Sequence, residues 1–204
     1  MNTANSPDAA SHWETLVLGI GNVLWADEGF GVRCVEHFNA RYQFPDRVRV
    51  MDGGTQGIFL LPWVRSAKRL LIFDAIDFAL PPATLKIIRG DHVPRYMGAK
   101  KVSMHQAGFQ EVLSSAQLTG DLSDELALIG VQPKILNDYG GSLTADVKLQ
   151  IEPAVAAACD LLGEWGVKLH ERATPLSADE LIGPGALAMA DYERGRPDLS
   201  GDGP

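Results

Sequence analysis

Apolar residues along this chain fall into short continuous runs separated by polar loops, a pattern that predicts buried strands between helices. The runs Thr15–Ile20, Arg69–Phe73 and Leu126–Val131 are apolar at nearly every position, as strands of a parallel sheet are when helices cover both faces. Arg47–Met51 alternates in a strand-like way, and Thr84–Ile88 contains a central lysine, which indicates a strand with one solvated face. We therefore expect about five strands.

Helical periodicity fills the intervals between these runs. A helix is expected from Gly31 to about Tyr42. A short, buried helix is expected over Ile58–Trp63, where Pro62 shortens or bends it. The remaining helices are predicted to start at Ser103, whose spacing to Gln106 matches a capping box, and at about Thr144, with Pro153 as a kink or restart and Gly166 as the end.

The order of strands and helices predicts an α/β fold with three layers: a twisted, mostly parallel sheet of about five strands with helices on both faces. We expect residues 14–170 to form this single domain. Residues 1–13 are polar and are expected to be a disordered leader. Residues 171–204 mix Pro, Gly and acids with little apolar periodicity, which is typical of a mostly disordered tail with at most one short helix near Leu187.

Composition and charge narrow the classes of partner. The 204-residue chain has 18 basic and 26 acidic residues and a net charge of −8, which disfavours nucleic acid because phosphate backbones select clusters of Lys and Arg. The chain does not begin with a basic segment followed by an apolar run, the pattern of a signal peptide. It also contains no run of about 18 apolar residues, the length that a membrane-spanning helix needs. We therefore expect a cytoplasmic protein with no membrane partner. Cys34 and Cys159 form no CxxC pair and are expected to be reduced, buried thiols.

Carboxylates follow the predicted strands at the ends where a parallel sheet places its ligands. Glu28 lies in the loop after the first apolar run, Asp74 follows Arg69–Phe73, and His105 lies in the first turn of the helix that starts at Ser103. The carboxyl ends of parallel strands share one edge of the sheet, so these three side chains are expected to meet there. Two carboxylates and an imidazole suit a divalent ion such as zinc or nickel and leave a coordination position open.

Other residues and another ligand class compete with this interpretation. Asp27, Asp52 and Asp77 lie in similar positions, and a carboxylate at a helix start is more often a cap than a metal ligand. Gly19–Leu24 begins like a dinucleotide fingerprint, but Leu24 stands where the third glycine is needed. Nucleotide binding is therefore a weak alternative. The motifs HExxH and GxSxG and the P-loop are absent from the sequence.

Several segments, taken in chain order, resemble the hydrogenase maturation proteases. The forms Trp25–Gly31 and Asp52–Gly57 resemble, more narrowly, the members that process uptake [NiFe]-hydrogenases. The resemblance covers residues 15–166 without a change of order. The segments that carry it are Gly19–Asn22, Asp27–Arg33, Asp52–Thr55, Phe73–Asp77, Ser103–Gln106 and Tyr139–Leu143.

This resemblance implies an endopeptidase that removes a short C-terminal extension from the hydrogenase large-subunit precursor once nickel has been inserted. It also implies that Glu28, Asp74 and His105 contact the metal, in agreement with the argument from strand ends. The divalent metal is then nickel, which the substrate itself can supply. The protein's partner is the large-subunit precursor.

The same resemblance assigns a role to the glycine-rich segment Asp52–Thr55, which follows the alternating strand Arg47–Met51. This segment matches a family segment implicated in recognising the nickel-loaded substrate. Asp52 is also a candidate base by its position, but no residue is assigned as the group that activates water. The substrate-binding residues that the resemblance implies are Asp52, Gly53, Gly54 and Thr55.

A noncatalytic, nickel-dependent chaperone that binds the same precursor is the alternative function.

Overall fold

A computed structural model describes residues 13–99, 104–123, 125–177, 180, 182–183 and 185–195. Of residues 97–99, 104–107 and 186 it describes the backbone alone. Residues 1–12 of the expected leader lie outside the described residues, as do Ser103 and residues 196–204 of the expected tail.

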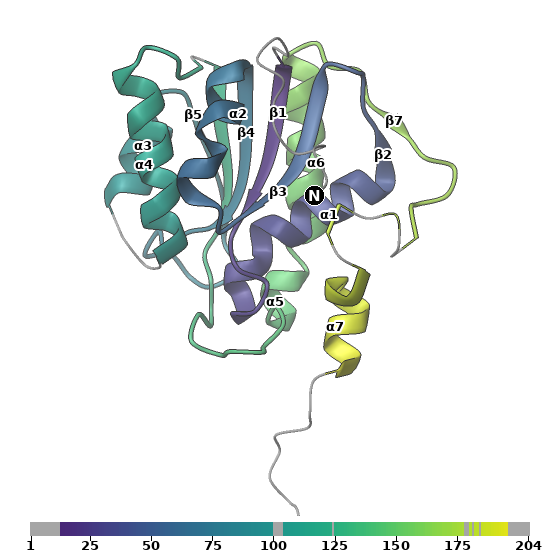
Figure 1. Ribbon diagram of the computed structural model, residues 1–204. Coiled ribbons are helices and arrows are strands. Elements are labelled where there is room, and N and C mark those ends of the chain that lie inside the picture. Colours follow the sequence, from purple (N-terminus) through teal and green to yellow (C-terminus); the bar gives the residue numbers. More distant parts are fainter. Residues whose placement is uncertain are drawn as a thin grey trace, which may run out of the picture.

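A five-stranded sheet with the order β3-β1-β4-β6-β5 forms the centre of the molecule (Figure 1). The first four of these strands run parallel to one another, and β5 pairs antiparallel with β6 at one edge. The mostly parallel sheet predicted from the sequence is therefore confirmed. The strands of this sheet are β1 (Trp13–Ile20), β3 (Val48–Gly54), β4 (Ala67–Ala75), β5 (Leu85–Arg89) and β6 (Glu125–Val131).

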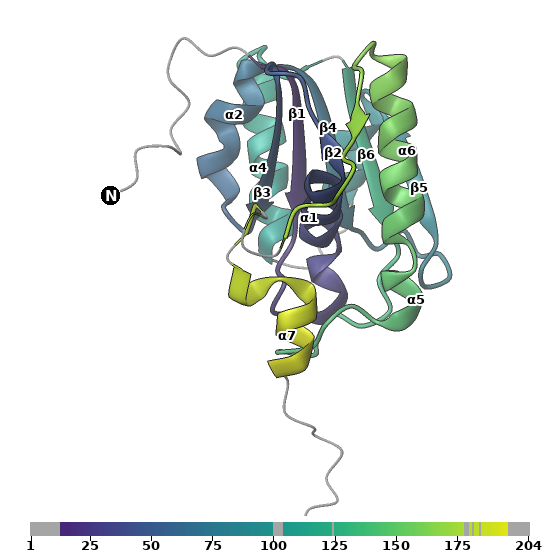
Figure 2. The same ribbon diagram turned by 90° about the vertical axis from the view of Figure 1, so that its right-hand side faces the viewer.

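Helices cover both faces of the sheet (Figure 2). On one face α1 (Phe30–Arg41) and α6 (Ile151–Glu164) bury their apolar sides, and on the other α2 (Leu61–Ser66) and α4 (Met104–Leu118) do so. No helix in the described ranges is long and apolar enough to cross a membrane. The shorter elements are η2 (Ala26–Gly29), η3 (Gly57–Leu60), α3 (His92–Ala99), α5 (Ala145–Lys148), η5 (Gly185–Leu187) and α7 (Met189–Gly195).

The continuous apolar runs divide between two cores. Because side chains alternate along a strand, Ile72 of β4 packs with α2 and α4, whereas Leu71 and Phe73 pack with α1 and α6. All three side chains are fully buried. This two-sided burial is why the central strands show no polar alternation in the sequence.

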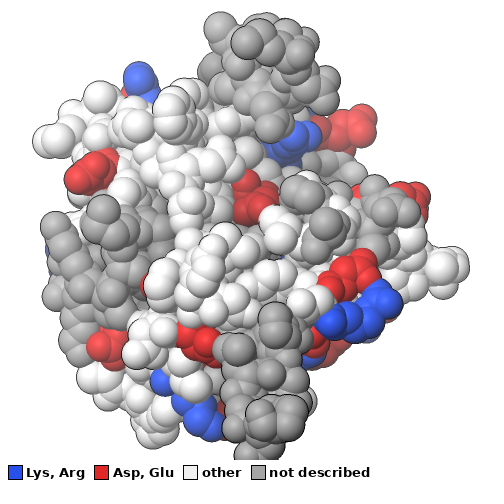
Figure 3. Space-filling view, turned by 60° about the horizontal axis from the view of Figure 1, so that its bottom comes forward, with Lys and Arg blue, Asp and Glu red and all other residues white. Residues whose placement is uncertain are grey.

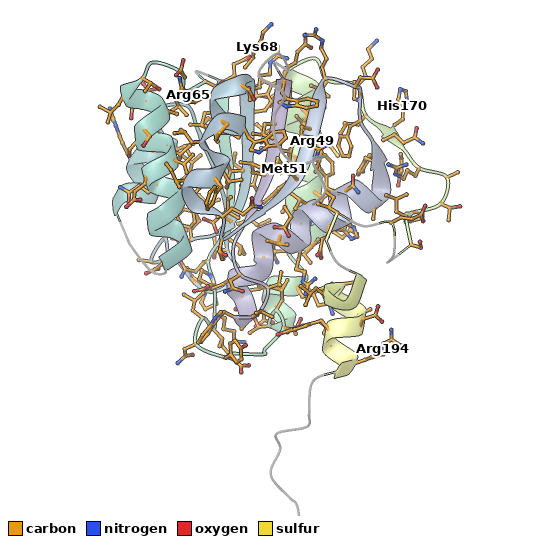
Figure 4. The ribbon with its side chains drawn as sticks, viewed as in Figure 1. Arg49, Met51, Arg65, Lys68, His170 and Arg194 are labelled. Carbon is orange, nitrogen blue, oxygen red and sulfur yellow. The ribbon has the colours of Figure 1, made fainter. Side chains whose placement is uncertain are left out.

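The alternating strand β3 lies at the open edge of the sheet. Arg49 and Met51 follow each other on the same face of this strand (Figure 4). The Arg49 guanidinium carbon lies 5.9 Å from the centroid of a Trp13 ring and 5.7 Å from that of a Trp63 ring, within the range of a cation–π contact. The charged side chain thus covers the end of the core and also protects the sheet edge from further pairing.

One local prediction is wrong. Ile58 and Phe59 were expected to be buried, but they are 52% and 78% exposed, and Leu60, Trp63 and Val64 make the core contacts instead.

The chain after α6 forms the short strand β7 (His170–Glu171), which pairs antiparallel with β2 (Tyr42–Gln43). The helix ends at Glu164 with Trp165 as its cap, because Gly166 adopts a φ of 76° and turns the chain back.

The proline in the last long helical pattern acts as a restart. The chain forms α5, passes through a turn at Leu149 and Gln150, and forms α6 from Ile151. Pro153 is the third residue of α6, where a backbone N–H has no intrahelical partner to lose. The short helix expected near Leu187 corresponds to η5 and the following α7.

Candidate functional site

The carboxyl ends of the parallel strands bring the predicted site segments to one edge. Gly19 of β1 pairs with Asp52 of β3 on one side and with Phe73 of β4 on the other. Asp52 and Asp74 therefore lie at nearly the same height, two strands apart. Asp74 follows Phe73, so it lies on the face that α4 covers, whereas Asp52 lies on the face that α1 covers.

The two adjacent acids of the first loop have different environments. Asp27 is fully buried. Its Oδ2 accepts hydrogen bonds from the backbone N–H groups of Lys134 and Ile135, both at 2.9 Å, and its Oδ1 accepts one from the backbone N–H of Thr144 at 2.7 Å. Glu28, next to it in η2, is half-buried. Asp27 is therefore an anchor for the distant loop, and Glu28 is the less buried of the two acids at the edge.

The same loop is fastened through its backbone and through aromatic side chains. The Ala26 N–H donates to the Gly141 carbonyl, and the Gly140 N–H donates to the Leu24 carbonyl. Trp25 and Tyr139 pair across this join with ring centroids 5.2 Å apart. The chain thus holds η2, and Glu28 with it, in a fixed position over the end of β1.

Asp74 is the last residue but one of β4, a central strand of the sheet. Its side chain is fully buried, and its Oδ1 accepts a hydrogen bond of 2.8 Å from the backbone N–H of Ala75. The element η2, which carries Glu28, packs against β4. Two of the three predicted metal-contacting residues therefore come from adjoining elements.

His105 lies in the first turn of α4, and its side chain is outside the described residues. Its backbone is nevertheless at the same edge. Because β6 starts at the amino edge of the sheet soon after α4 ends at Leu118, α4 runs from the carboxyl edge toward the amino edge. Gly108, one turn after His105, also packs against Gly57, the first residue of η3, with 3.4 Å between the Cα of Gly57 and a Cβ built on Gly108.

The described side chains include no group of three His, Cys, Asp or Glu residues close enough to hold a metal ion. The donor chemistry of Glu28, Asp74 and His105 does fit a divalent ion of the nickel or zinc type, since it combines carboxylate oxygens with an imidazole. The metal triad stays a prediction.

The segment Asp52–Thr55, here called the substrate loop, leaves the sheet through a bulge. The pairing with β1 jumps from Asp52 to Gly54, so Gly53 is the extra residue. A Cβ on Gly53 would lie 2.7 Å from the side chain of Ile20, and Gly54 has a φ of 44°. The backbone conformation therefore favours glycine at position 54, and a side chain at position 53 would require Ile20 to shift.

Asp52 is less well satisfied than Asp27. Burial raises the pKa of its carboxyl group, and the backbone amide of Gly54 and the charge of Arg33 oppose that rise. Its Oδ1 is buried and accepts no hydrogen bond from any group in the described part of the chain. Gln56 donates instead to the Asp52 backbone carbonyl, at 2.9 Å.

A buried ion pair beside this loop was missed from the sequence. Arg33 is 3% exposed and Glu36 is 7% exposed, and Arg33 Nη1 donates to Glu36 Oε2 at 2.8 Å. Burial raises the pKa of Glu36, and the Arg33 charge opposes that effect. The spacing of three in the first turn of a helix was the available signal, but it is equally typical of an exposed pair.

Uncharged side chains make up most of the described surface on this side of the molecule, with separate acidic groups among them (Figure 3). Ile58 and Phe59 follow the substrate loop, and Trp25 and Tyr139 lie on two loops that a β-bridge joins. Their exposed fractions are 52%, 78%, 36% and 67%. Such a setting suits an extended peptide better than a small charged metabolite, because apolar side chains of a chain can contact it on both sides of the acids.

The partial dinucleotide fingerprint has a different purpose in the fold. A Cβ on Gly19 would lie 2.3 Å from the Gly31 carbonyl oxygen, and one on Gly21 would lie 1.8 Å from the Glu28 carbonyl oxygen. The glycines allow α1 and η2 to pack directly on the end of β1. The space that a pyrophosphate would need at that turn is filled by the chain itself.

The comparisons with known proteins agree with the resemblance seen in the sequence. Residues 32–161 match the family described as hydrogenase maturation protease. The hydrogenase expression/formation protein HupM of Azotobacter chroococcum is 57% identical over 183 residues, which is 89% of this chain and 86% of that protein. The hydrogenase 2 maturation protease of Escherichia coli is 42% identical, over 77% of this chain and 95% of that protein.

A solved structure gives the same result for the fold. The hydrogenase maturating endopeptidase HybD from E. coli superposes with a TM-score of 0.74 at 41% sequence identity. The match covers 78% of this chain and 98% of that one. This chain therefore contains segments that the E. coli structure lacks.

Proposed function

Because this chain belongs to the hydrogenase maturation proteases, we propose that it is the endopeptidase that removes the C-terminal extension of a nickel-loaded [NiFe]-hydrogenase large-subunit precursor. The observation that carries the proposal is the meeting of Glu28, Asp74, the turn of His105 and the substrate loop at one edge of the sheet. These are the segments that the family resemblance picked out independently.

In the proposed site, Glu28, Asp74 and His105 contact the nickel of the precursor. The ion belongs to the substrate, and these three side chains detect it by binding to it. A bound divalent ion supplies polarisation of the scissile carbonyl or of a water molecule. This arrangement would restrict cleavage to precursors that already carry their metal.

The substrate loop and the exposed apolar side chains then hold the precursor's chain. Gly54, which is half-buried, presents a backbone without a side chain, to which an extended peptide can approach closely. The reaction itself adds water to the carbonyl carbon, breaks the C–N bond and releases the extension as a protonated amine. We propose that it takes place in the cytoplasm, where large-subunit precursors are made.

A mass-spectrometric assay tests this function. The purified large-subunit precursor is incubated with the protein, with and without loaded nickel, and its mass is measured over time. We expect loss of a C-terminal peptide from the nickel-loaded form alone. Cleavage regardless of nickel would overturn the role given to the substrate's metal. Stable binding without cleavage would favour a nickel-dependent chaperone.

A further inference from the structure

The end of the described chain packs against the site edge. Leu187, just before α7, accepts a hydrogen bond of 2.5 Å from Arg33 Nη1 through its carbonyl. The Arg33 guanidinium carbon also lies 5.7 Å from the centroid of the Tyr192 ring. Figure 2 shows this C-terminal segment, residues 185–195, at the foot of α1. It lies beyond the residues 32–161 that match the family.

A second group of contacts fastens the same segment to the loop that Asp27 anchors. Glu193 accepts hydrogen bonds from Ser142 Oγ at 2.7 Å and from Lys148 Nζ at 2.8 Å. Lys148 and Ser142 lower the pKa of Glu193, although its partial burial raises it. The segment is thus attached at two places, on α1 and on the chain around α5.

Arg33 connects this segment to the substrate loop. It is buried, it bonds to Glu36 on its own helix, and it lies on α1, the helix that packs against β3 on the face where Asp52 lies. Its charge also opposes the rise in the pKa of Asp52. Within the described residues three buried polar atoms of this region have no hydrogen-bond partner: Arg33 Nη2, Asp52 Oδ1 and Tyr192 Oη. Such groups are uncommon in native proteins, and each calls for an explanation. One explanation is a site in which the polar groups of a ligand supply the missing hydrogen bonds.

We propose that Arg33 is a positioning residue for the substrate loop and that the C-terminal segment, by holding Arg33 in place, is part of the processing site. The inference rests on the function proposed above. Arg33 supplies the positive charge on the α1 side of the Asp52 carboxylate without bonding to it, and Asp52 Oδ1 remains as an acceptor for a peptide N–H of the precursor. The segment makes this pair rigid by binding Arg33 through Leu187 and Tyr192.

Four full-length variants, assayed for processing of nickel-loaded precursor, test the proposal. Arg33→Met removes the charge, Arg33→Lys keeps it, and Tyr192→Ala loosens the segment. Arg194→Ala is the matched control, because Arg194 lies on α7 with a side chain 76% exposed and bonds only within its own helix in the described structure (Figure 4).

We expect Arg33→Met to raise KM for the precursor about tenfold, with a smaller change in kcat, and Tyr192→Ala to raise it about threefold. Arg33→Met should also move the acid limb of the kcat/KM profile to higher pH. Among the described residues, the charged groups near Asp52 are Arg33 and Glu36 of α1, with Glu193 of α7 and its partner Lys148 behind Arg33. Losing the Arg33 charge raises the pKa of Asp52 further. Arg33→Lys should bring both KM and the acid limb most of the way back to the wild-type values, and Arg194→Ala should match the wild type.

Thermal unfolding of each variant separates positioning from simple stability. A lower melting temperature of Arg33→Met with unchanged KM and pH profile would overturn the proposal. If Arg33→Met does not fold, an unchanged KM in Tyr192→Ala would overturn it instead. Failure of the wild type to process the precursor is a different result, because it would remove the proposed function itself and this inference with it.

Discussion

Asp27 and Asp52 are both buried acids at the same edge of the sheet, yet their surroundings differ. Asp27 accepts three backbone hydrogen bonds from a loop more than 100 positions away in the chain. Asp52 has a buried oxygen with no partner in the described structure, and burial raises the pKa of its carboxyl group. A carboxylate whose lone pairs are used by backbone N–H groups holds the fold together. One left partly unsatisfied is available to a ligand.

The same contrast separates Asp27 from its neighbour Glu28. One peptide bond divides them, but η2 turns Asp27 into the protein and leaves Glu28 half-buried at the edge. The role of each acid is therefore determined by whether its side chain reaches the backbone N–H groups of a distant segment. Substitutions at these acids can therefore distinguish loss of function from loss of fold.

The largest expected effect is on activity. Glu28→Gln keeps the size of the side chain but removes its charge, so we expect processing of the nickel-loaded precursor to fall by about a thousandfold or more, with unfolding free energy within about 0.5 kcal/mol of the wild type. His105→Ala should also abolish processing. Mass spectrometry and urea unfolding measure the two quantities. Glu111→Gln, an exposed acid on α4, is the control. Normal processing by both Glu28→Gln and His105→Ala would refute the site assignment.

The next effect is on stability. Asp27→Asn places an amide N–H₂ where Asp27 now accepts backbone hydrogen bonds, so a donor would face donors. We expect a loss of about 3 kcal/mol in unfolding free energy, measured by urea denaturation. Asp46→Asn, at an exposed acid, should change it little. If Asp27→Asn left stability intact but stopped processing, Asp27 would belong to the site and the contrast with Asp52 would fail.

The sequence predicted the sheet well, because burial on both faces leaves continuous apolar runs that short-range patterns can read. It also placed the site segments at one edge, since parallel strands must end together. It could not tell Asp27 from Glu28. The partners of Asp27 are Lys134, Ile135 and Thr144, and no local signal connects them to residue 27.

The buried Arg33 was missed for the same reason. Its partner Leu187 lies 154 positions away, in a segment whose composition predicts a tail. Phe59 shows the opposite error, because an apolar residue next to Leu60 and Trp63 was assigned to the core although it is 78% exposed. Hydrophobicity alone does not distinguish a core residue from one at a binding surface.

A smaller effect on activity is expected at Asp52. Asp52→Asn retains hydrogen-bonding capacity but not charge, so we expect KM for the precursor to rise about tenfold and kcat to change less. Steady-state processing assays with Asp46→Asn as control measure this. An unchanged KM would mean that the unsatisfied oxygen of Asp52 has no part in holding the substrate.

The smallest expected effect is a gain in unfolding free energy when Asp52 is replaced, whereas replacement of Asp27 is expected to lower it. Because burial raises the Asp52 pKa above its ordinary 3.8, the native state binds this proton more tightly than the unfolded state, and stability falls as pH rises from 3.8 through the raised pKa. Asp52→Asn removes the buried charge and should be more stable than the wild type at pH 7, by up to about 1 kcal/mol. The difference should vanish below pH 3.8, where both unfolded and native Asp52 carry a proton. Urea denaturation of both proteins from pH 3 to pH 7 measures it. A wild type more stable than Asp52→Asn at pH 7 would show that attraction to Arg33 outweighs burial, and Asp52 would then join Asp27 as an acid that stabilises the fold.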